Sequence, residues 1–175
     1  SISGMKDLLH RLNYSYKKPK LVPGKADEKA QEEFVEYYKE LKNTKDANDP
    51  VYFMDGSHPQ HNSVAAYGWI KKGTVKELKS NTGRQRLNIN SAFNIEELSA
   101  VAGYDDSINA QSTISLLKKI ESKHPSANAI YTICDNARYY RSKMVKEYLE
   151  KSKVQLVFLP PYSPNLNLIE RLWKY

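Results

Sequence analysis

Along the last two thirds of the chain, short continuous runs of apolar residues alternate with segments in which apolar residues recur at helical spacing. Continuous apolar runs indicate buried strands, and apolar residues three or four positions apart indicate helices with one packed face. The predicted strands are residues 51–54, 65–70, 86–93, 98–102, 129–134 and 155–159. The predicted helices are residues 110–122, residues 140–151 and the segment that contains Glu170. In the helix at residues 140–151, the side chains expected to face inward are Met144, Val145, Tyr148 and Leu149. An antiparallel meander followed by alternating helices and strands predicts an α/β fold, with a mixed sheet flanked by helices.

Two more helices are predicted before this region, at residues 3–12 and 26–43. In the first, apolar residues recur at helical spacing and Ser3 is a candidate N-cap. The second has an acidic face opposite an apolar stripe. The stripe residues are Ala30, Phe34, Tyr37, Tyr38 and Leu41. We place a domain boundary near Pro50, after the turn-forming segment that follows the second helix.

The composition narrows the class of protein. The 175 residues suit one domain with an appendage, and the single cysteine excludes an internal disulfide framework and a cysteine-based zinc site. No apolar run approaches the roughly 20 residues of a membrane helix, and the N-terminus lacks a signal-peptide pattern. We therefore expect a cytoplasmic protein with no membrane partner. Because the first residue is not Met, we also expect a fragment of a longer chain.

The charge is consistent with a polyanionic partner. The net charge is +7, from 27 basic and 20 acidic residues, and basic residues cluster in residues 71–86 and 138–153. Residues 13–25 are basic and contain prolines, which suits either an arm on DNA phosphates or an ordinary connector. Solvated surface would also explain each basic run taken alone. The candidate DNA-binding residues are Lys17, Lys18, Lys20, Lys71, Lys72, Arg84, Arg86, Asn136, Arg138 and Arg141.

Three acidic residues occupy comparable positions after predicted strands. Asp55 and Asp135 each follow a buried strand, and Glu170 follows the last strand across the proline-rich corner of residues 160–164. Carboxylates at neighbouring strand ends repel each other unless a cation neutralises them. Oxygen ligands favour Mg²⁺ or Mn²⁺, and two such ions can activate a water or a 3′-hydroxyl for phosphodiester chemistry.

Each of these residues also has a purely structural explanation. Asp55 and Asp135 can act as turn formers at strand ends. The spacing from Asn167 to Glu170 is that of a capping box. His58, in the loop after Asp55, could orient a water as an auxiliary group or could have no catalytic role. The metal-site hypothesis depends on the three acids occurring together with the proline corner.

The chain contains, in order, the segments MDGSHPQHN, YGWIKKG, CDNARYYRSKMV and LPPYSPNLNLIERLW. Together these segments resemble the catalytic domain of bacterial insertion-sequence transposases of the mariner superfamily. The 34 residues between Asp135 and Glu170 are a spacing typical of that branch. The resemblance implies an RNase H-like fold in residues 51–175 with a DDE triad of Asp55, Asp135 and Glu170. It also implies that residues 1–25 end a helix-turn-helix region and its linker, with a linker helix in residues 26–50.

The resemblance further implies an activity and partners. Family members cleave double-stranded DNA at terminal inverted repeats and join 3′-hydroxyls to target DNA, commonly at TA, as at least a dimer. We therefore expect a metal-dependent transposase that uses two Mg²⁺ or Mn²⁺ ions and forms a homodimer. The alternatives are a nuclease of the same fold without strand transfer, and a DNA-binding protein that has lost catalysis. Asn165 and Leu168 stand where the family more commonly has Asp and Pro. Neither replacement removes a proposed ligand, but Pro is pre-organised for the first helical position and Leu is not.

Overall fold

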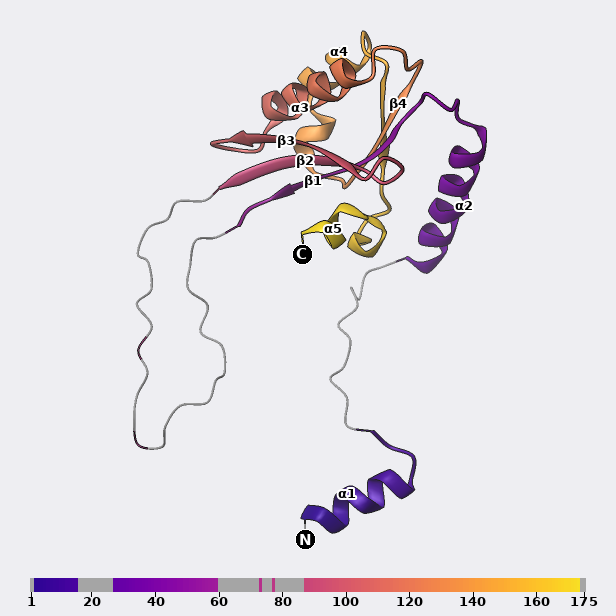
Figure 1. Ribbon diagram of the computed structural model, residues 1–175, viewed down its shortest axis with the longest axis vertical. Coiled ribbons are helices and arrows are strands. Elements are labelled where there is room, and N and C mark those ends of the chain that lie inside the picture. The colour runs from indigo at the N-terminus through magenta and orange to yellow at the C-terminus, as the bar shows by residue number, and fades with distance from the viewer. Residues whose placement is uncertain (1, 16–26, 60–72, 74–76, 78–86, 174–175) are drawn as a thin grey trace.

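The computed structural model describes residues 2–15, 27–59, 73, 77 and 87–173. A five-stranded sheet with strand order β3-β2-β1-β4-β5 lies at its centre (Figure 1). The first three strands are antiparallel neighbours, and the last two run parallel to β1. The strands are β1 (Val51–Ser57), β2 (Asn88–Asn94), β3 (Ser99–Asp105), β4 (Ile130–Cys134) and β5 (Val154–Phe158). The mixed sheet confirms the predicted fold class, while the strand predicted at residues 65–70 lies outside the described residues.

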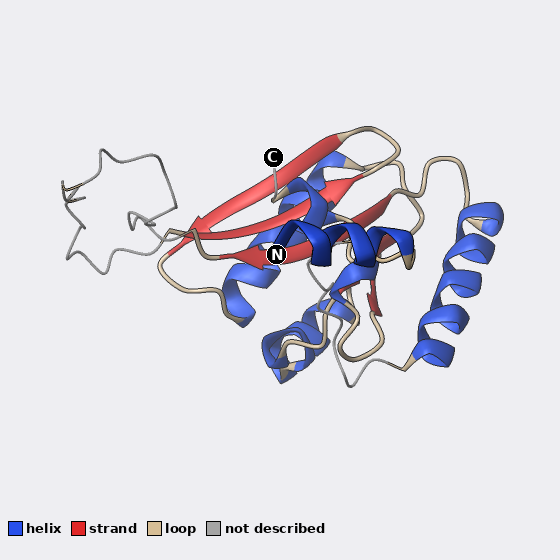
Figure 2. Ribbon diagram, turned by 90° about the horizontal axis from the view of Figure 1, so that it is seen from below, coloured by secondary structure: helices blue, strands red, loops and turns tan. Residues whose placement is uncertain are grey.

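Helices lie on both faces of the sheet (Figure 1). The helices are α1 (Ile2–Arg11), α2 (Glu28–Thr44), α3 (Ala110–Lys123), α4 (Lys143–Leu149) and α5 (Ile169–Leu172). Two short 3₁₀ segments, η1 (Arg138–Arg141) and η2 (Pro164–Leu166), precede α4 and α5. Seen from below, α2 stands at one side of the domain (Figure 2). None of these helices is long and apolar enough to cross a bilayer.

Alternation along β1 divides the core into two layers, because successive side chains of a strand point to opposite faces. Tyr52 and Met54 are fully buried against the α3 side. Val51 and Phe53 are buried on the other face, where Ile169 of α5 packs against them. Asp55, the next odd-numbered residue, therefore belongs to the face that α5 covers.

The acidic helix α2 packs on this same second layer. The rings of Tyr38 and Phe53 lie 5.6 Å apart, edge to face, and Phe34 also packs on the layer. Leu41 is buried, whereas Tyr37 is 44% exposed. The packed stripe of α2 is therefore narrower than the sequence predicted.

Three local predictions are wrong. The segment predicted as one helix at residues 140–151 is divided, because Ser142 is extended (φ −65°, ψ 156°) and its side chain caps α4 by accepting from the Val145 amide. Met144 was expected to face inward, but it is 50% exposed because Val145 takes the buried position of this short helix. Ser3 is not an N-cap, since α1 already begins at Ile2.

The sheet register sets two acidic residues side by side. The parallel register of β1 on β4 pairs Phe53 with Ile133, an offset of 80 residues (133 − 53). The same offset, continued for two residues, sets Asp55 level with Asp135. Asp55 does not end its strand as predicted, because antiparallel pairing with β2 carries β1 on to Ser57. The parallel pairing of β1 with β4 ends at Phe53, before Asp55, whereas the pairing of β1 with β2 continues beyond it.

Candidate active site

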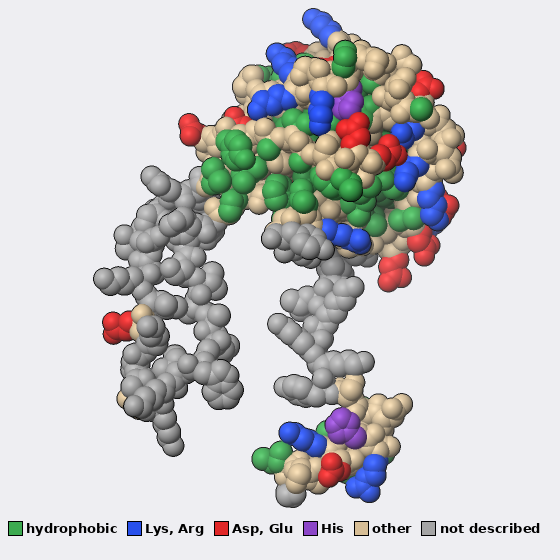
Figure 3. Space-filling view, viewed as in Figure 1, with side chains coloured by type: hydrophobic (Ala, Val, Ile, Leu, Met, Phe, Trp, Pro, Cys, Tyr) green, Lys and Arg blue, Asp and Glu red, His purple; other side chains and the backbone are tan. Residues whose placement is uncertain are grey.

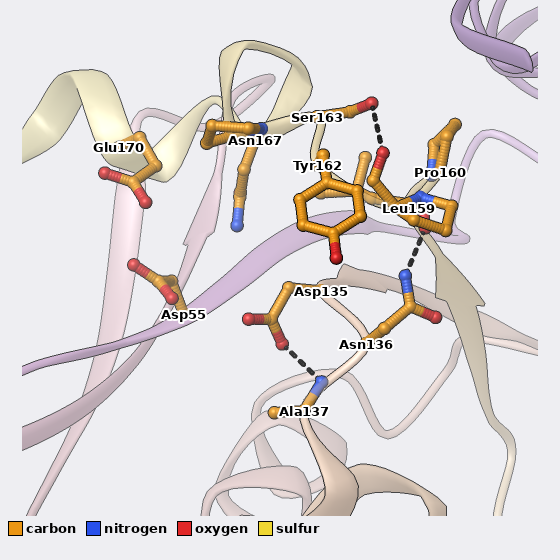
Figure 4. A pocket seen from close by; sticks show the side chains of 12 residues that line it. Asp55, Asp135, Asn136, Ala137, Leu159, Pro160, Tyr162, Ser163, Asn167 and Glu170 are labelled. Atoms are coloured by element: carbon orange, nitrogen blue, oxygen red, sulfur yellow. Dashed lines mark hydrogen bonds between the residues drawn. The ribbon is translucent and has the colours of Figure 1, made fainter. Parts of the chain in front are cut away.

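A pocket of about 520 Å³ opens where β4 and β5 end and the proline-rich corner begins (Figure 4). One wall is acidic and carries Asp55, Asp135 and Glu170. The remainder of the lining comes from the turn after Asp135 and from the corner. These residues are Asn136, Ala137, Leu159, Pro160, Pro161, Tyr162, Ser163, Pro164 and Asn167.

Asp55 lies between the other two acidic residues. Its carboxylate faces that of Glu170, and the second oxygen of Asp135 points toward it (Figure 4). Burial, together with the charges of Glu170 and Asp135, raises the pKa of Asp55 from 3.8 to about 6. Hydrogen bonds from the Trp173 indole and the Gly56 amide oppose that rise. The charges of both other carboxylates therefore affect the pKa of Asp55.

Asp135 is exposed at the end of β4. Its Oδ1 accepts a hydrogen bond of 2.9 Å from the Ala137 amide, so the turn proposed as its structural role does form. The bond uses one oxygen and fixes the side chain, while the other oxygen remains directed at the pocket (Figure 4). A turn-forming role and a pocket role are thus compatible at this position.

Glu170 is placed by its neighbours in the chain. Ile169 is fully buried in the second core layer, and the Asn167 side-chain amide donates to the Met54 carbonyl at 3.3 Å. The hypothesis of a capping box from Asn167 to Glu170 is wrong, because the N-cap of α5 is Leu168 and no side chain caps it. Glu170 is therefore half-buried and directed at Asp55 rather than at a helix end.

Trp173 was not singled out by the sequence reasoning. Its indole Nε1 donates to Asp55 Oδ2 at 3.0 Å. Its position three residues after Glu170 gives a usable signal, since residues that far apart share a helix face. Glu170 in α5 and the indole N–H of Trp173, the residue that follows α5, therefore both face Asp55.

Residues 50–175 match the family described as DDE superfamily endonuclease, and residues 1–38 match a winged helix-turn-helix family. The first match covers well over half of the chain. The chain belongs to the DDE superfamily endonucleases.

This DDE endonuclease is also similar to an insertion-element product and to transposases of known structure. It is 28% identical over 131 residues to the insertion element IS630 uncharacterized 39 kDa protein of Shigella sonnei, covering 73% of this chain and 38% of that protein. A Mos1 transposase paired-end complex with the left transposon end has a TM-score of 0.69 at 15% identity, covering 98% of this chain and 55% of that chain. The Mos1 mariner paired-end complex with Mn has a TM-score of 0.66 at 17% identity, covering 95% of this chain and 53% of that chain.

These comparisons confirm the RNase H-like fold and the resemblance to insertion-sequence transposases of the mariner superfamily. The endonuclease chain spans 38% of the length of the curated relative and about half of the length of the Mos1 chains. The activity and partners of a whole protein are therefore matters for proposal.

Two of the candidate DNA-binding residues contact each other. Arg141 donates to Asn136 Oδ1 at 2.6 Å, and Asn136 in turn donates to the Leu159 carbonyl at 2.6 Å. The Arg141 guanidinium also lies 3.8 Å from the centre of the Phe158 ring. These contacts join the turn after Asp135 to the end of β5. A DNA contact by Asn136 or Arg141 stays a prediction.

The other candidates either do not line the pocket or lie outside the described residues. Arg138 is exposed in η1. His58 is exposed, forms a hydrogen bond of 2.7 Å with Asn88 and does not line the pocket, so the structure does not bring it to the triad. The candidates outside the described residues are Lys17, Lys18, Lys20, Lys71, Lys72, Arg84 and Arg86.

Proposed function

We propose that this endonuclease is the catalytic part of a transposase that cleaves double-stranded DNA at the ends of its element and joins the 3′-ends to target DNA. The observation that carries the proposal is the convergence of Asp55, Asp135 and Glu170, from β1, β4 and α5, on one pocket. The similarity to an insertion-element product and to Mos1 transposase supports the same reaction class. Use of TA targets and assembly as a homodimer are parts of the proposal that rest on the family resemblance.

The three carboxylates are proposed as ligands for divalent cations. Among the described residues, no three His, Cys, Asp or Glu side chains are close enough together to enclose a single ion. Asp55 nevertheless faces Glu170 on one side and Asp135 on the other (Figure 4). Asp55, Asp135 and Glu170 would together hold two such ions. The all-oxygen donor set suits Mg²⁺ or Mn²⁺.

The raised pKa of Asp55 supports a cation at this position. Ionised Asp55 is unfavourable in a half-buried site beside two other acids, and a divalent ion would reverse that balance. When bound, such ions supply an activated water or 3′-hydroxyl and stabilise the leaving oxygen of a phosphodiester.

The chain's own residues fix the ligand geometry before any ion arrives. The Ala137 amide holds Asp135, and the Trp173 indole holds Asp55. The buried side chain of Ile169 keeps Glu170 over β1. Preorganised ligands of this kind lower the reorganisation that the reaction requires.

The deciding experiment uses the full-length protein and a labelled duplex of an inverted-repeat end with Mg²⁺ or Mn²⁺. We expect metal-dependent cleavage that falls roughly 10³-fold in Asp135→Asn. Asp106→Asn, an exposed acid away from the pocket, serves as the matched control and should cleave like the wild type. Cleavage that survives Asp135→Asn would refute the assigned role.

A second readout separates the transposase from its alternatives. Addition of a target plasmid should yield joined products from the wild type. Hydrolysis without joining would favour a nuclease of the same fold. Binding without cleavage in either metal would favour a DNA-binding protein that has lost catalysis.

A further inference from the structure

The pocket wall across from Asp55 and Glu170 is apolar (Figure 4). It is formed by Ala137 and by the start of the proline-rich corner, residues 159–162. Tyr162 stands at its rim with 57% of its surface exposed. Figure 4 shows the ring lying across the pocket from Glu170 and Asp55. The pocket therefore has one wall suited to cations and phosphate and another suited to a flat apolar group.

The corner that carries Tyr162 is tied down on both sides. The Leu159 amide donates to the Cys134 carbonyl at 2.9 Å, and Asn136 donates to the Leu159 carbonyl. After the tyrosine, Ser163 is 4% exposed and its hydroxyl donates to the Pro161 carbonyl at 3.3 Å. Together with the proline rings, which fix their own φ, these bonds hold the backbone on either side of the ring.

Tyr162 also has an unusual backbone conformation. Its φ is +57°, in the left-handed region that glycine and asparagine adopt far more readily than an aromatic residue. Residues held in such conformations cluster at ligand-binding and active sites. A glycine would form this turn with less strain, and the exposed tyrosine ring lines the pocket.

We propose that Tyr162 and the adjoining prolines form a nucleobase subsite, in which the ring stacks on a base next to the phosphate bound at the acidic wall. The inference rests on the proposed function, because it needs DNA in this pocket. A phosphate at the carboxylates leaves its nucleoside to face the opposite wall. Aromatic rings stack on any base, so the subsite would hold an unstacked base with little sequence preference. A cavity of about 520 Å³ is within the range that small-molecule ligands occupy.

The test is a double-mutant cycle between the protein and the DNA, read as binding affinity. Full-length protein is titrated with inverted-repeat duplexes in which each nucleotide near the cleavage position is replaced in turn by an abasic analogue. We expect Tyr162→Leu to weaken binding of the intact duplex about 5- to 100-fold, the range of base–aromatic stacking. At one position the abasic duplex should bind Tyr162→Leu and the wild type equally, since the stacked base is absent.

Matched variants separate stacking from folding. Tyr162→Phe keeps the ring and should keep the coupling. Tyr162→Gly relaxes the positive φ and should melt no lower than the wild type, yet lose the coupling as Tyr162→Leu does. Tyr104→Leu, which removes a tyrosine that is 70% exposed on β3 and does not line the pocket, should leave binding unchanged.

The outcomes distinguish the subsite from the proposed function. Wild-type protein that binds and cleaves the duplex but shows no coupling with Tyr162 at any position would overturn the subsite and leave the transposase standing. Coupling in a protein that never cleaves would support the subsite and overturn the proposed chemistry. Absence of any DNA binding would overturn both.

Discussion

In the candidate site, burial disfavours the charged form of Asp55. Burial raises its pKa to about 6 in the folded protein, above the value of 3.8 that it has when exposed. The folded state therefore binds more protons than the unfolded state between about pH 4 and pH 6. Protonation of Asp55 therefore contributes stability that is complete below about pH 4 and is lost as pH rises through about 6. At neutral pH without metal, ionised Asp55 is a destabilising group.

We predict that Asp55→Asn stabilises the metal-free protein at pH 7 by roughly 1 kcal/mol, a few degrees in melting temperature. Asparagine removes the charge and can still accept from the Trp173 indole. Thermal melts at pH 7 and pH 4 check this, because the gain should vanish where Asp55 is protonated. Asp106→Asn is the control, since Asp106 is exposed and does not line the pocket. Equal melting of Asp55→Asn and wild type at pH 7 would contradict the prediction.

Trp173 has the opposite effect to burial on the pKa of the Asp55 carboxyl. Its N–H bond lowers the pKa of Asp55, so Trp173→Phe should raise that pKa above about 6. Because a protonated carboxyl is a poor cation ligand, Mn²⁺ binding should weaken at a higher pH in the variant than in the wild type. Mn²⁺ titrations followed by electron paramagnetic resonance between pH 5 and pH 8 measure the displacement. Tyr104→Phe, at an exposed position that does not line the pocket, is the control variant. An unshifted profile in Trp173→Phe would count against the indole's role.

At the scale of the element, α5 is too short to be stable by itself. Four residues form a single helical turn, and isolated helices below about 12 residues are marginal in water. Its position comes from tertiary contacts, with Ile169 in the core and Asn167 bonded to the Met54 carbonyl. Glu170 is therefore only as well placed as these two contacts allow.

We predict that Asn167→Ala loosens α5 and lowers cleavage while the sheet stays folded. The substitution leaves the buried Met54 carbonyl without this donor, a loss of about 1–3 kcal/mol. Hydrogen exchange should accelerate at the amides of Glu170 and Trp173 and remain slow in β1 and β4. Asn165→Ala is the matched control, because Asn165 makes an exposed bond to Gln31 at 3.1 Å. Unchanged exchange in α5 would show that Ile169 alone holds the helix.

The end of α3 depends on a lysine from a distant element. Lys153 Nζ donates to the carbonyls of His124, Pro125 and Ala127 at 2.6, 3.1 and 3.2 Å. A cation there also interacts favourably with the negative end of the helix. We predict that Lys153→Met lowers the free energy of unfolding by about 1–3 kcal/mol in urea titrations. Lys151→Met, at an exposed neighbouring position, should change it little, and equal effects of the two would disprove the capping role.

At the scale of the whole molecule, none of the described residues that line the pocket is basic. On the face shown in Figure 3, basic and acidic side chains are interspersed, with hydrophobic side chains across the middle of the domain. The net charge of +7 includes seven candidate DNA-binding residues that lie outside the described residues. Affinity for DNA is therefore expected to depend on those segments, while the pocket supplies the chemistry.

We predict that replacing Lys17, Lys18 and Lys20 together with Gln weakens DNA binding equally for all sequences. If each lysine neutralises one phosphate, the slope of log affinity against log salt should become shallower by up to about 3. Fluorescence anisotropy between 50 and 200 mM salt measures that slope. Lys39→Gln is a control within α2, where Lys39 pairs with Glu36 at 2.8 Å. An unchanged slope in the triple variant would make these residues an ordinary connector.

The sequence by itself determined the fold class, most strand and helix positions and the three acids of the candidate site. Hydrophobic periodicity and proline chemistry are local properties of the chain, so they can be read without coordinates. Because these patterns are local, they do not predict contacts with other elements. The division of residues 140–151 and the exposure of Met144 depend on such contacts.

Only the tertiary structure decided how the acids meet. The register between β1 and β4 sets Asp55 beside Asp135, and that register spans 80 residues of sequence (133 − 53). The indole bond of Trp173 to Asp55 and the exposed Tyr162 on its left-handed backbone likewise depend on where distant strands and the corner come together. Residue types and spacing specify which groups are available, but distances between groups far apart in sequence are fixed by pairing and packing, which no local pattern encodes.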